Sequence, residues 1–363
     1  MKTLSIPICR ISLFSLFLAI VACSDSSNNN GDRSDNAGLA DASRQAQLAV
    51  GAAVSTDASS GQLAVVSREF TSVTAENAMK WASIAATPDS YDFSNADQLV
   101  DFAISNGQRI RGHTLFWHRL NGIPPWLSGE LDKASDPAAR LRELMVIHTD
   151  TVVGRYAGRV AQWDVINEPL AIVGGDFDPE NIFYRLLGED YLDIALLEAH
   201  AADPSAELFI NETFVEFQPR KFDALIALAQ RLLDRGIPLH GLGLQGHFFV
   251  RAPDEVVLRD QLQRIAALGL KVEITELDIP LPLFDGSPDP LAAQAQAYQD
   301  VFSACLAVTS CSGITVWGID DAHTWLDTFL AITAPNRPLL FDEMLQPKPA
   351  YDSVVATLFA MPR

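Results

Sequence analysis

The chain has 363 residues, a length that fits either two domains of ordinary size or one large α/β barrel. Hydrophobic residues make up 48% of the sequence and charged residues 20%, which excludes an extensively disordered or coiled-coil protein. The net charge is −20 and there are four cysteines, which argues against nucleic-acid binding and against a zinc-ribbon or disulfide-dense fold.

The N-terminus has the layout of a secretory signal over residues 1–22. Positive charges precede an apolar run at residues 11–22 that is too short to span a bilayer. Cys23 follows this run at the place where the processing of bacterial lipoproteins requires a cysteine. The pattern therefore predicts a lipoprotein signal peptide and lipidation of Cys23. Ordinary cleavage near Ala22, with Cys23 incidental, is the alternative.

The segment after Cys23 is typical of a tether between a lipid anchor and a folded domain. Ser24 resembles the signal for sorting to the outer membrane, and residues 24–38 are almost free of apolar side chains. Such a segment cannot bury enough surface to repay the entropy of ordering. We expect a flexible tether over residues 23–42, which suits either face of that membrane, and one folded domain over residues 43–363.

Short β-rich runs alternate with longer amphipathic runs through the rest of the chain. The expected strands are residues 49–54, 71–76, 109–115, 160–167, 207–211, 240–246, 271–277 and 313–318. Apolar strands separated by helical stretches indicate a parallel sheet covered by helices. Eight such units are typical of a (β/α)8 TIM barrel, an α/β fold. An open doubly wound sheet is the alternative, but no glycine-rich phosphate loop follows the first strand.

Three of the helices between these strands have recognisable ends. A helix over residues 95–106 ends before Gly107, a residue suited to the left-handed position after a helix. Asp136, followed by a proline, predicts the start of a second helix. Asp254 predicts the start of a third, which ends before Gly269.

Polar and aromatic side chains gather at the expected strand ends. They are Glu76, Asn77, His113, Asn167, Glu168, Asn211, Gln245, His247, Glu276 and Trp317. Any one of them alone is more often structural than functional. Their accumulation at the carboxyl ends of the strands, where a TIM barrel builds its active site, predicts a functional site there.

Two carboxylates stand out among these residues. Glu168 follows the fourth strand and Glu276 the seventh, which lie across the barrel mouth from one another. Glycoside hydrolysis needs such a pair, because one carboxyl group protonates the leaving oxygen and the other, ionised, attacks the anomeric carbon. The pair therefore predicts a glycosidase.

The surrounding residue types suit a sugar. Asn, Gln, His and Lys80 offer hydrogen bonds to hydroxyl groups, and tryptophan faces stack on sugar rings. The candidates for stacking are Trp81, Trp117, Trp317 and Trp325, of which Trp81 fits core packing equally well. No G-x-S-x-G nucleophile turn and no clustered metal ligands occur in the sequence, so we expect neither a metal nor another cofactor.

Long motifs carry a resemblance to a known family. They are VTAENAMKW (73–81), RGHTLFWH (111–118), WDVINEP (163–169), LGLQGHF (242–248), EITELD (273–278), ITVWG (314–318) and PLLFD…PKPAY (338–351). In this order, the motifs resemble those of the glycoside hydrolase family 10 endo-1,4-β-xylanases. The resemblance implies a (β/α)8 barrel that hydrolyses internal β-1,4-xylosidic bonds of xylan or xylo-oligosaccharides with retention of configuration.

The resemblance also implies roles for individual residues. Glu168 would be the acid/base and Glu276 the nucleophile, while Asn167 would bond the 2-hydroxyl of the sugar being cleaved. His247 would orient Glu276, and Asp278 would steady that histidine. The remaining substrate-binding residues would be Glu76, Asn77, Lys80, His113, Trp117, Asn211, Gln245, Trp317 and Trp325.

Two cysteines and several loops complete the comparison with the family. Cys305 and Cys311 are spaced as a disulfide pair is in many members, with two buried thiols as the alternative. The family usually has Asn-Asp-Tyr where this chain has Asn211-Glu212-Thr213, and glutamine where it has Arg119. Such differences affect the leaving-group subsites and leave the chain-length preference open.

Two other functions are compatible with the same residues. One is another retaining β-1,4-glycanase, such as a cellulase or a mixed-linkage glucanase. The other is a non-catalytic glycan-binding lipoprotein, against which the presence of both carboxylates and their supporting histidine argues. We expect a monomer with no nucleic-acid partner, exported as a lipoprotein and held at the outer membrane through Cys23.

Overall fold

The computed structural model describes residues 37–329 and 335–362. The expected signal peptide, Cys23 and most of the expected tether lie outside this part of the chain. The folded domain begins earlier than predicted, because helix α1 (Leu39–Ala46) contains the last residues of the segment 23–42 that was expected to be a tether. Leu39 and Ala42 are fully buried, so these residues belong to the core.

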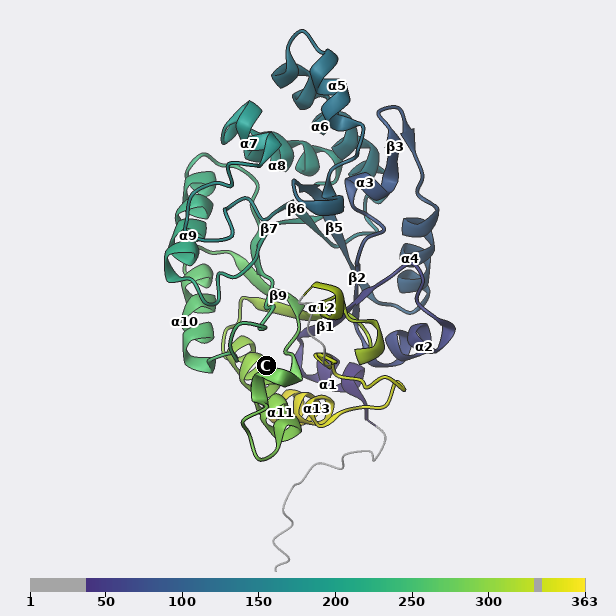
Figure 1. Cartoon of the computed structure of the whole chain (residues 1–363), viewed down its shortest axis with the longest axis vertical. Helices are drawn as coiled ribbons and strands as arrows, with labels where there is room; N and C mark the ends of the chain where they lie inside the picture. Colours follow the sequence, from purple (N-terminus) through teal and green to yellow (C-terminus); the bar gives the residue numbers. More distant parts are fainter. Residues whose placement is uncertain (1–36, 330–334, 363) are drawn as a thin grey trace, which may run out of the picture. The chain divides into compact units, whose positions relative to one another are not determined.

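Parallel strands close into a barrel in the described part of the chain (Figure 1). Its strands are β1 (Ala49–Val54), β2 (Ser72–Ala75), β5 (Arg109–Trp117), β6 (Gln162–Asn167), β7 (Glu207–Glu212), β8 (Gly241–Leu244), β9 (Lys271–Leu277) and β10 (Cys311–Val316). Each overlaps a predicted strand, and the order β1-β10-β9-β8-β7-β6-β5-β2 closes the ring. The predicted (β/α)8 barrel is confirmed.

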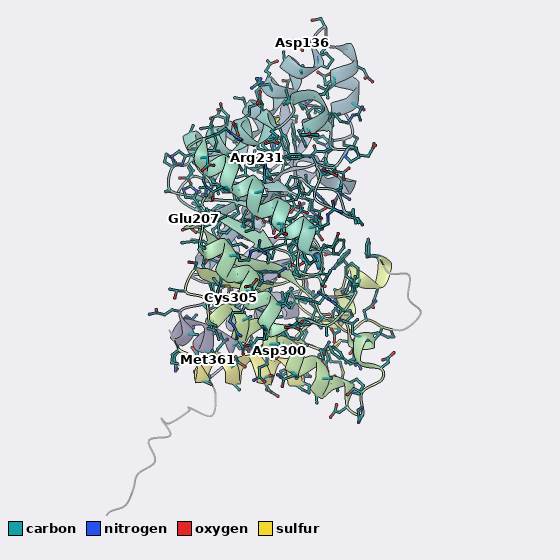
Figure 2. All side chains as sticks on the ribbon, turned by 90° about the vertical axis from the view of Figure 1, so that its left-hand side faces the viewer. Asp136, Glu207, Arg231, Asp300, Cys305 and Met361 are labelled. Atoms are coloured by element: carbon teal, nitrogen blue, oxygen red, sulfur yellow. A yellow bond between two sulfur atoms is a disulfide. The ribbon has the colours of Figure 1, made fainter. Side chains whose placement is uncertain are left out.

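Helices surround the barrel, and Figure 2 shows α9 and α11 in this outer layer with Arg231 and Asp300 labelled on them. Besides α1, the helices are α2 (Ser60–Glu69), α3 (Trp81–Ile84), α4 (Ser94–Ser105), α5 (Leu127–Lys133), α6 (Pro137–Arg155), α7 (Ile182–Leu187), α8 (Asp190–Ala202), α9 (Pro219–Asp234), α10 (Glu255–Ala266), α11 (Pro290–Leu306), α12 (Leu326–Phe329) and α13 (Pro349–Ala360). Short 3-10 helices form η1 (Leu120–Gly122), η2 (Leu281–Phe284) and η3 (Asp321–His323), and β3 (Ala85–Thr87) pairs with β4 (Ser90–Tyr91). Among the described residues, none of the helices has the length and apolar character needed to cross a bilayer.

The four predicted helix ends are confirmed, two by capping contacts and two by the backbone conformation of a glycine. The Asp136 carboxylate accepts a hydrogen bond from the backbone N–H of Ala139, and Asp254 caps α10 in the same way. Gly107 and Gly269 have φ of 65° and 80°, the left-handed conformation that favours glycine after a helix. Local residue types thus determine where these helices start and stop.

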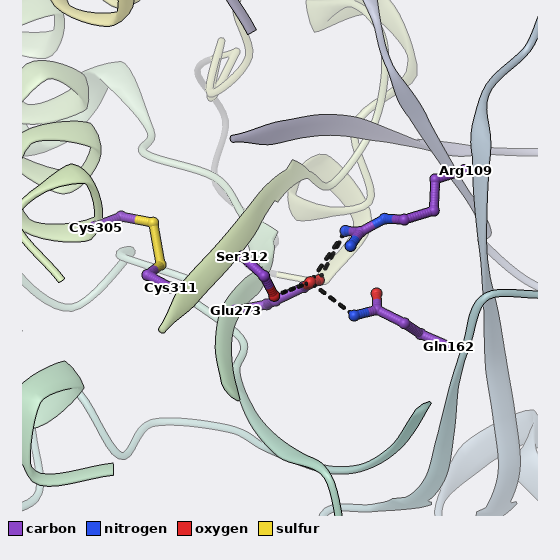
Figure 3. Close-up of a disulfide and its surroundings, with 6 residues drawn as sticks. All are labelled: Arg109, Gln162, Glu273, Cys305, Cys311 and Ser312. Atoms are coloured by element: carbon purple, nitrogen blue, oxygen red, sulfur yellow. Dashed lines mark hydrogen bonds and ion pairs between the residues drawn. A yellow bond between two sulfur atoms is a disulfide. The ribbon is translucent and has the colours of Figure 1, made fainter. Parts of the chain in front are cut away.

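A buried charge network ties the strands together near their N-terminal ends. Arg111 makes an ion pair with Asp164 and a second with Glu273, at 3.1 Å. Glu273 also accepts hydrogen bonds from three neighbouring side chains, those of Arg109, Gln162 and Ser312 (Figure 3). Buried charges persist only when they are paired in this way, and the network links four strands of the barrel wall.

A disulfide lies next to this network (Figure 3). It joins Cys305 in α11 to Cys311 at the start of β10, six residues away in sequence. This is the pairing that the family resemblance implied. Closing a loop this short restricts the unfolded chain by an amount worth about 2 kcal/mol.

Candidate active site

A cavity of about 640 Å³ opens at the carboxyl ends of the barrel strands. Of the predicted site residues, those that line it are Glu76, Asn77, Lys80, His113, Trp117, Asn167, Glu168, Gln245, His247, Glu276, Trp317 and Trp325. The barrel brings these side chains together from β2, β5, β6, β8, β9, β10 and the loops that follow them. Trp81 is fully buried and belongs to the core instead.

Two predicted site residues lie behind the cavity wall. Asn211 and Asp278 are fully buried and do not line the cavity. Asn211 was expected to bind substrate, but its side-chain amide instead donates hydrogen bonds to Glu276 and to Asn167. The side chain of Asn211 therefore acts on the site through its neighbours, because β7 directs it into the barrel interior.

Glu276 is held as an ionised carboxylate. Asn211 Nδ2 donates to its Oε1 at 2.6 Å, and His247 Nε2 lies 3.1 Å from its Oε2. Burial alone would raise the pKa of Glu276, but the hydrogen bond from His247 and the nearby histidine charges outweigh that effect and lower it. The result is an oriented anion facing the cavity.

His247 connects Glu276 to Asp278. Its Nδ1 lies 2.9 Å from Asp278 Oδ2, and the same oxygen accepts a hydrogen bond from Trp325 Nε1 at 2.7 Å. Burial opposes protonation of His247, yet Asp278 and Glu276 on either side raise its pKa to about 10. A doubly protonated imidazole donates to both carboxylates, so it fixes the position of Glu276 and balances its charge.

Glu168 stands in a different environment. Gln245 Nε2 donates to its Oε1 at 3.0 Å, and Arg119 Nε lies 3.3 Å from its Oε2. Its backbone has φ of 54°, a left-handed conformation that is rare for a residue with a side chain. The Glu168 backbone N–H donates to Asn211 O at 2.8 Å, which anchors this strained residue to β7.

Arg119 and its partners are site residues that the sequence did not assign. Arg119 makes an ion pair with Asp178, whose carboxylate also accepts a hydrogen bond from His118 Nε2 at 3.1 Å. Arg119, His118 and Asp178 all line the cavity. The substitution of Arg119 for the family's usual glutamine was the available signal, but only the fold shows that its guanidinium reaches Glu168.

Another part of the cavity wall presents a chain of polar contacts. Lys80 Nζ donates to Asn77 Oδ1 at 2.8 Å, and Asn77 Nδ2 donates to Glu76 Oε1 at 3.2 Å. Lys80 Nζ also lies 4.8 Å from the centre of the Trp117 ring. Burial lowers the pKa of Lys80 although the carboxylates around it oppose the shift. These groups offer both hydrogen-bond donors and acceptors. Sugar hydroxyl groups, which donate and accept, can bind to such a row.

Aromatic side chains that the sequence did not single out extend the cavity wall past Trp325. Phe329 packs on Trp325 with ring centroids 4.7 Å apart, and Phe249 lies 5.7 Å from Phe329. Phe214, 5.4 Å from Phe249, lines the cavity together with Phe329. Phe214 stands just after β7, so its position was a usable signal, whereas Phe329 lies at the end of the short helix α12, which was not predicted.

The arrangement provides the parts of acid/base and nucleophilic chemistry. One carboxylate is oriented by two donors and its pKa is lowered by the nearby histidines, while the other accepts a hydrogen bond from an amide and faces the same cavity. Within residues 37–329 and 335–362, no three His, Cys, Asp or Glu side chains are grouped as metal ligands are. Two carboxylates arranged in this way can cleave a glycosidic bond through a covalent intermediate.

Comparisons with known proteins identify the family of the chain. The sequence matches glycosyl hydrolase family 10 over residues 38–357. It is 38% identical to a β-1,4-xylanase of Dictyoglomus thermophilum, covering 80% of this chain and 83% of that relative. It is 35% identical to endo-1,4-β-xylanase B of Paenibacillus barcinonensis, covering 84% and 94%. The structure matches xylanase 10B of Thermotoga petrophila RKU-1, solved with xylobiose, with a TM-score of 0.83, 31% identity and coverage of 92% and 100%. The chain therefore belongs to glycosyl hydrolase family 10.

Proposed function

We propose that the protein is an endo-1,4-β-xylanase that hydrolyses internal β-1,4-xylosidic bonds of xylan or xylo-oligosaccharides with retention of configuration. The observation that carries the proposal is the pair Glu168 and Glu276, which face one cavity from the ends of β6 and β9 with different hydrogen-bond partners. The relatives named as xylanases, and the match to a xylanase solved with xylobiose, support the substrate class.

In the first step Glu276 attacks the anomeric carbon, and the bond from that carbon to the glycosidic oxygen breaks. Glu168 gives its proton to the departing oxygen, so the leaving sugar carries away a hydroxyl group. A covalent glycosyl-enzyme with inverted configuration forms on Glu276. In the second step Glu168 takes a proton from water, the water oxygen attacks the same carbon, and the second inversion restores the β configuration.

Neighbouring side chains orient the substrate for these steps. Asn167 Oδ1 accepts a hydrogen bond from Asn211 Nδ2 at 2.8 Å, which leaves its amide N–H groups for the 2-hydroxyl of the sugar being cleaved. Glu76, Asn77 and Lys80 bind the sugar on the non-reducing side of the cut. Trp117, Trp317 and Trp325 provide its apolar walls, while His113 and Gln245 complete the polar lining.

Replacing His247 by glutamine is expected to move the acidic limb of the kcat/KM profile to higher pH. Activity requires ionised Glu276. Together with His113, His247 lowers the pKa of Glu276 against the effect of burial, through its hydrogen bond and its charge. Without them the pKa of Glu276 rises, and activity is lost at a higher pH on acidification. The measurement is kcat/KM on an aryl β-xylobioside from pH 3 to 9. His200→Gln, on the outer helix α8, is the control, and an unmoved limb in His247→Gln would contradict the role.

Product time courses test the proposed function itself. Purified protein lacking residues 1–23 is expected to release a spread of mid-length products early from glucuronoarabinoxylan, and to cleave linear xylohexaose. It should act far more slowly on carboxymethylcellulose. Equal or faster attack on carboxymethylcellulose would favour a glucanase, and no cleavage of any of these substrates would favour a glycan-binding protein.

We also propose that the protein is exported and anchored at the outer membrane. The support is the signal-like run over residues 11–22, Cys23 at its end and the polar segment that follows. Metabolic labelling with radioactive palmitate in a bacterial host is expected to label the wild-type chain. The label should be lost in Cys23→Ala, and an unchanged label in that variant would refute the anchor.

A further inference from the structure

The backbone that follows Glu168 is attached to the neighbouring strand at a second point. Glu168 is in the left-handed conformation, and its own N–H is bound to Asn211 O. The next residue, Pro169, has no N–H to donate. The first amide after Glu168 that can be held is therefore that of Leu170, and it donates to Glu212 Oε2 at 3.0 Å.

Glu212 is itself held in place by a buried ion pair. It ends β7 and is fully buried, and its other oxygen accepts a hydrogen bond from the backbone N–H of Thr213 at 2.9 Å. Lys221 Nζ of α9, also fully buried, lies 2.9 Å from the same oxygen. Burial raises the pKa of Glu212 to about 7 against the influence of Lys221. Removing two charges from water costs about as much as their attraction returns, so a buried pair of this kind adds little net stability to the fold.

The two attachment points sit on adjacent residues of one strand. The backbone oxygen of Asn211 accepts a hydrogen bond from the N–H of Glu168. The Glu212 carboxylate accepts one from the N–H of Leu170, the residue after Pro169. Together they span the strained turn and determine the direction in which the Glu168 side chain leaves the backbone. If the backbone of an acid/base residue moves by about 1 Å, the rate of proton transfer from its side chain falls strongly.

We propose that the buried Glu212–Lys221 pair is a positioning device for Glu168, which it holds at the angle needed to protonate the leaving oxygen. This inference rests on the proposed acid/base role of Glu168. Neither Glu212 nor Lys221 lines the cavity, so the pair acts through the backbone of Leu170. Its loss should therefore impair the protonation step and leave the nucleophilic attack by Glu276 intact.

The double variant Glu212→Leu/Lys221→Met tests the proposal. It removes both charges at once, so no unpaired charge is left in the core, and replacements of this kind are often neutral for stability. On xylohexaose, whose leaving group needs protonation, kcat/KM is expected to fall about 10²-fold. On 2,4-dinitrophenyl β-xylobioside, whose leaving group departs without protonation, it should fall by no more than about threefold.

A second buried pair provides the matched control. Asp321 makes an ion pair with Lys348 at 2.7 Å and accepts a hydrogen bond from the backbone N–H of Leu339 at 2.8 Å. This repeats the carboxylate, lysine and backbone amide of the Glu212 site in a place that does not touch Glu168. Asp321→Leu/Lys348→Met should change kcat/KM on the two substrates by the same factor.

The outcomes separate this inference from the proposed function. A loss in the Glu212→Leu/Lys221→Met variant that is equal for both substrates, or no loss on either, would overturn the positioning role. If that variant does not fold, Glu212→Gln carries the test, because it keeps an acceptor for Leu170 but loses the ion pair. It is expected to show a smaller loss, about tenfold, confined to xylohexaose. A wild-type chain inactive on both substrates would overturn the proposed function and this inference with it.

Discussion

Glu276→Ala is expected to lower kcat on xylan by about 10⁵-fold while the barrel stays folded. The variant lacks the atom that forms the covalent intermediate, and the remaining groups of the site are built around that step. Asn211 and His247 both donate to the Glu276 carboxylate, and without it neither of them can attack carbon. Turnover of xylan by reducing-sugar release, with circular dichroism to verify folding, gives the result.

Chemical rescue distinguishes loss of a nucleophile from any other loss. Azide can enter the space left by the Glu276 side chain and attack an activated aryl β-xylobioside from the same face. One displacement then gives the α-xylobiosyl azide, with inverted configuration. Glu143→Ala, on the surface of α6, is the control and should retain wild-type turnover. Near-normal xylan turnover by Glu276→Ala, or a β-configured azide product, would contradict the assignment.

The loss of kcat/KM in Glu168→Ala is expected to depend on whether the leaving group of the substrate needs a proton. On xylohexaose the first step needs a proton from Glu168, so kcat/KM should fall by about 10³-fold. On 2,4-dinitrophenyl β-xylobioside the first step needs no proton, so kcat/KM should stay within about tenfold of wild type. The second step still lacks its base, and the glycosyl-enzyme should therefore accumulate on Glu276.

Mass spectrometry and azide provide the measurements for this variant. The intact protein should gain the mass of one xylobiosyl group during turnover of the dinitrophenyl substrate. Azide needs no general base, so it should restore turnover and give the β-xylobiosyl azide, because it attacks the α-linked intermediate from the opposite face. Glu168→Ala and Glu276→Ala thus give azides of opposite configuration. Equal losses of kcat/KM on both substrates would refute the acid/base role of Glu168.

The features that the sequence by itself determined are those that depend on near neighbours in the chain. The capping residues Asp136 and Asp254 start their helices where predicted, because a cap needs only the N–H groups of the next few residues. The strands followed from short apolar runs, and their number and alternation with helices indicated the barrel. The barrel rule then placed Glu168 and Glu276 in one site, since the carboxyl ends of all its strands face the same way.

Tertiary structure decided the contacts between residues that are distant in sequence. Glu212 reaches Leu170 across 42 positions, and the Arg111 network connects residues more than 160 positions apart. Periodicity predicts which face a side chain occupies, but it does not give the distance to atoms on another strand. Asn211 illustrates the difference, because its place at a strand end was predicted, whereas its burial behind Glu276 depends on the direction of β7. The folded domain begins earlier than predicted for the same reason. The residues of α1 are ordered by the core on which they pack and not by their own composition.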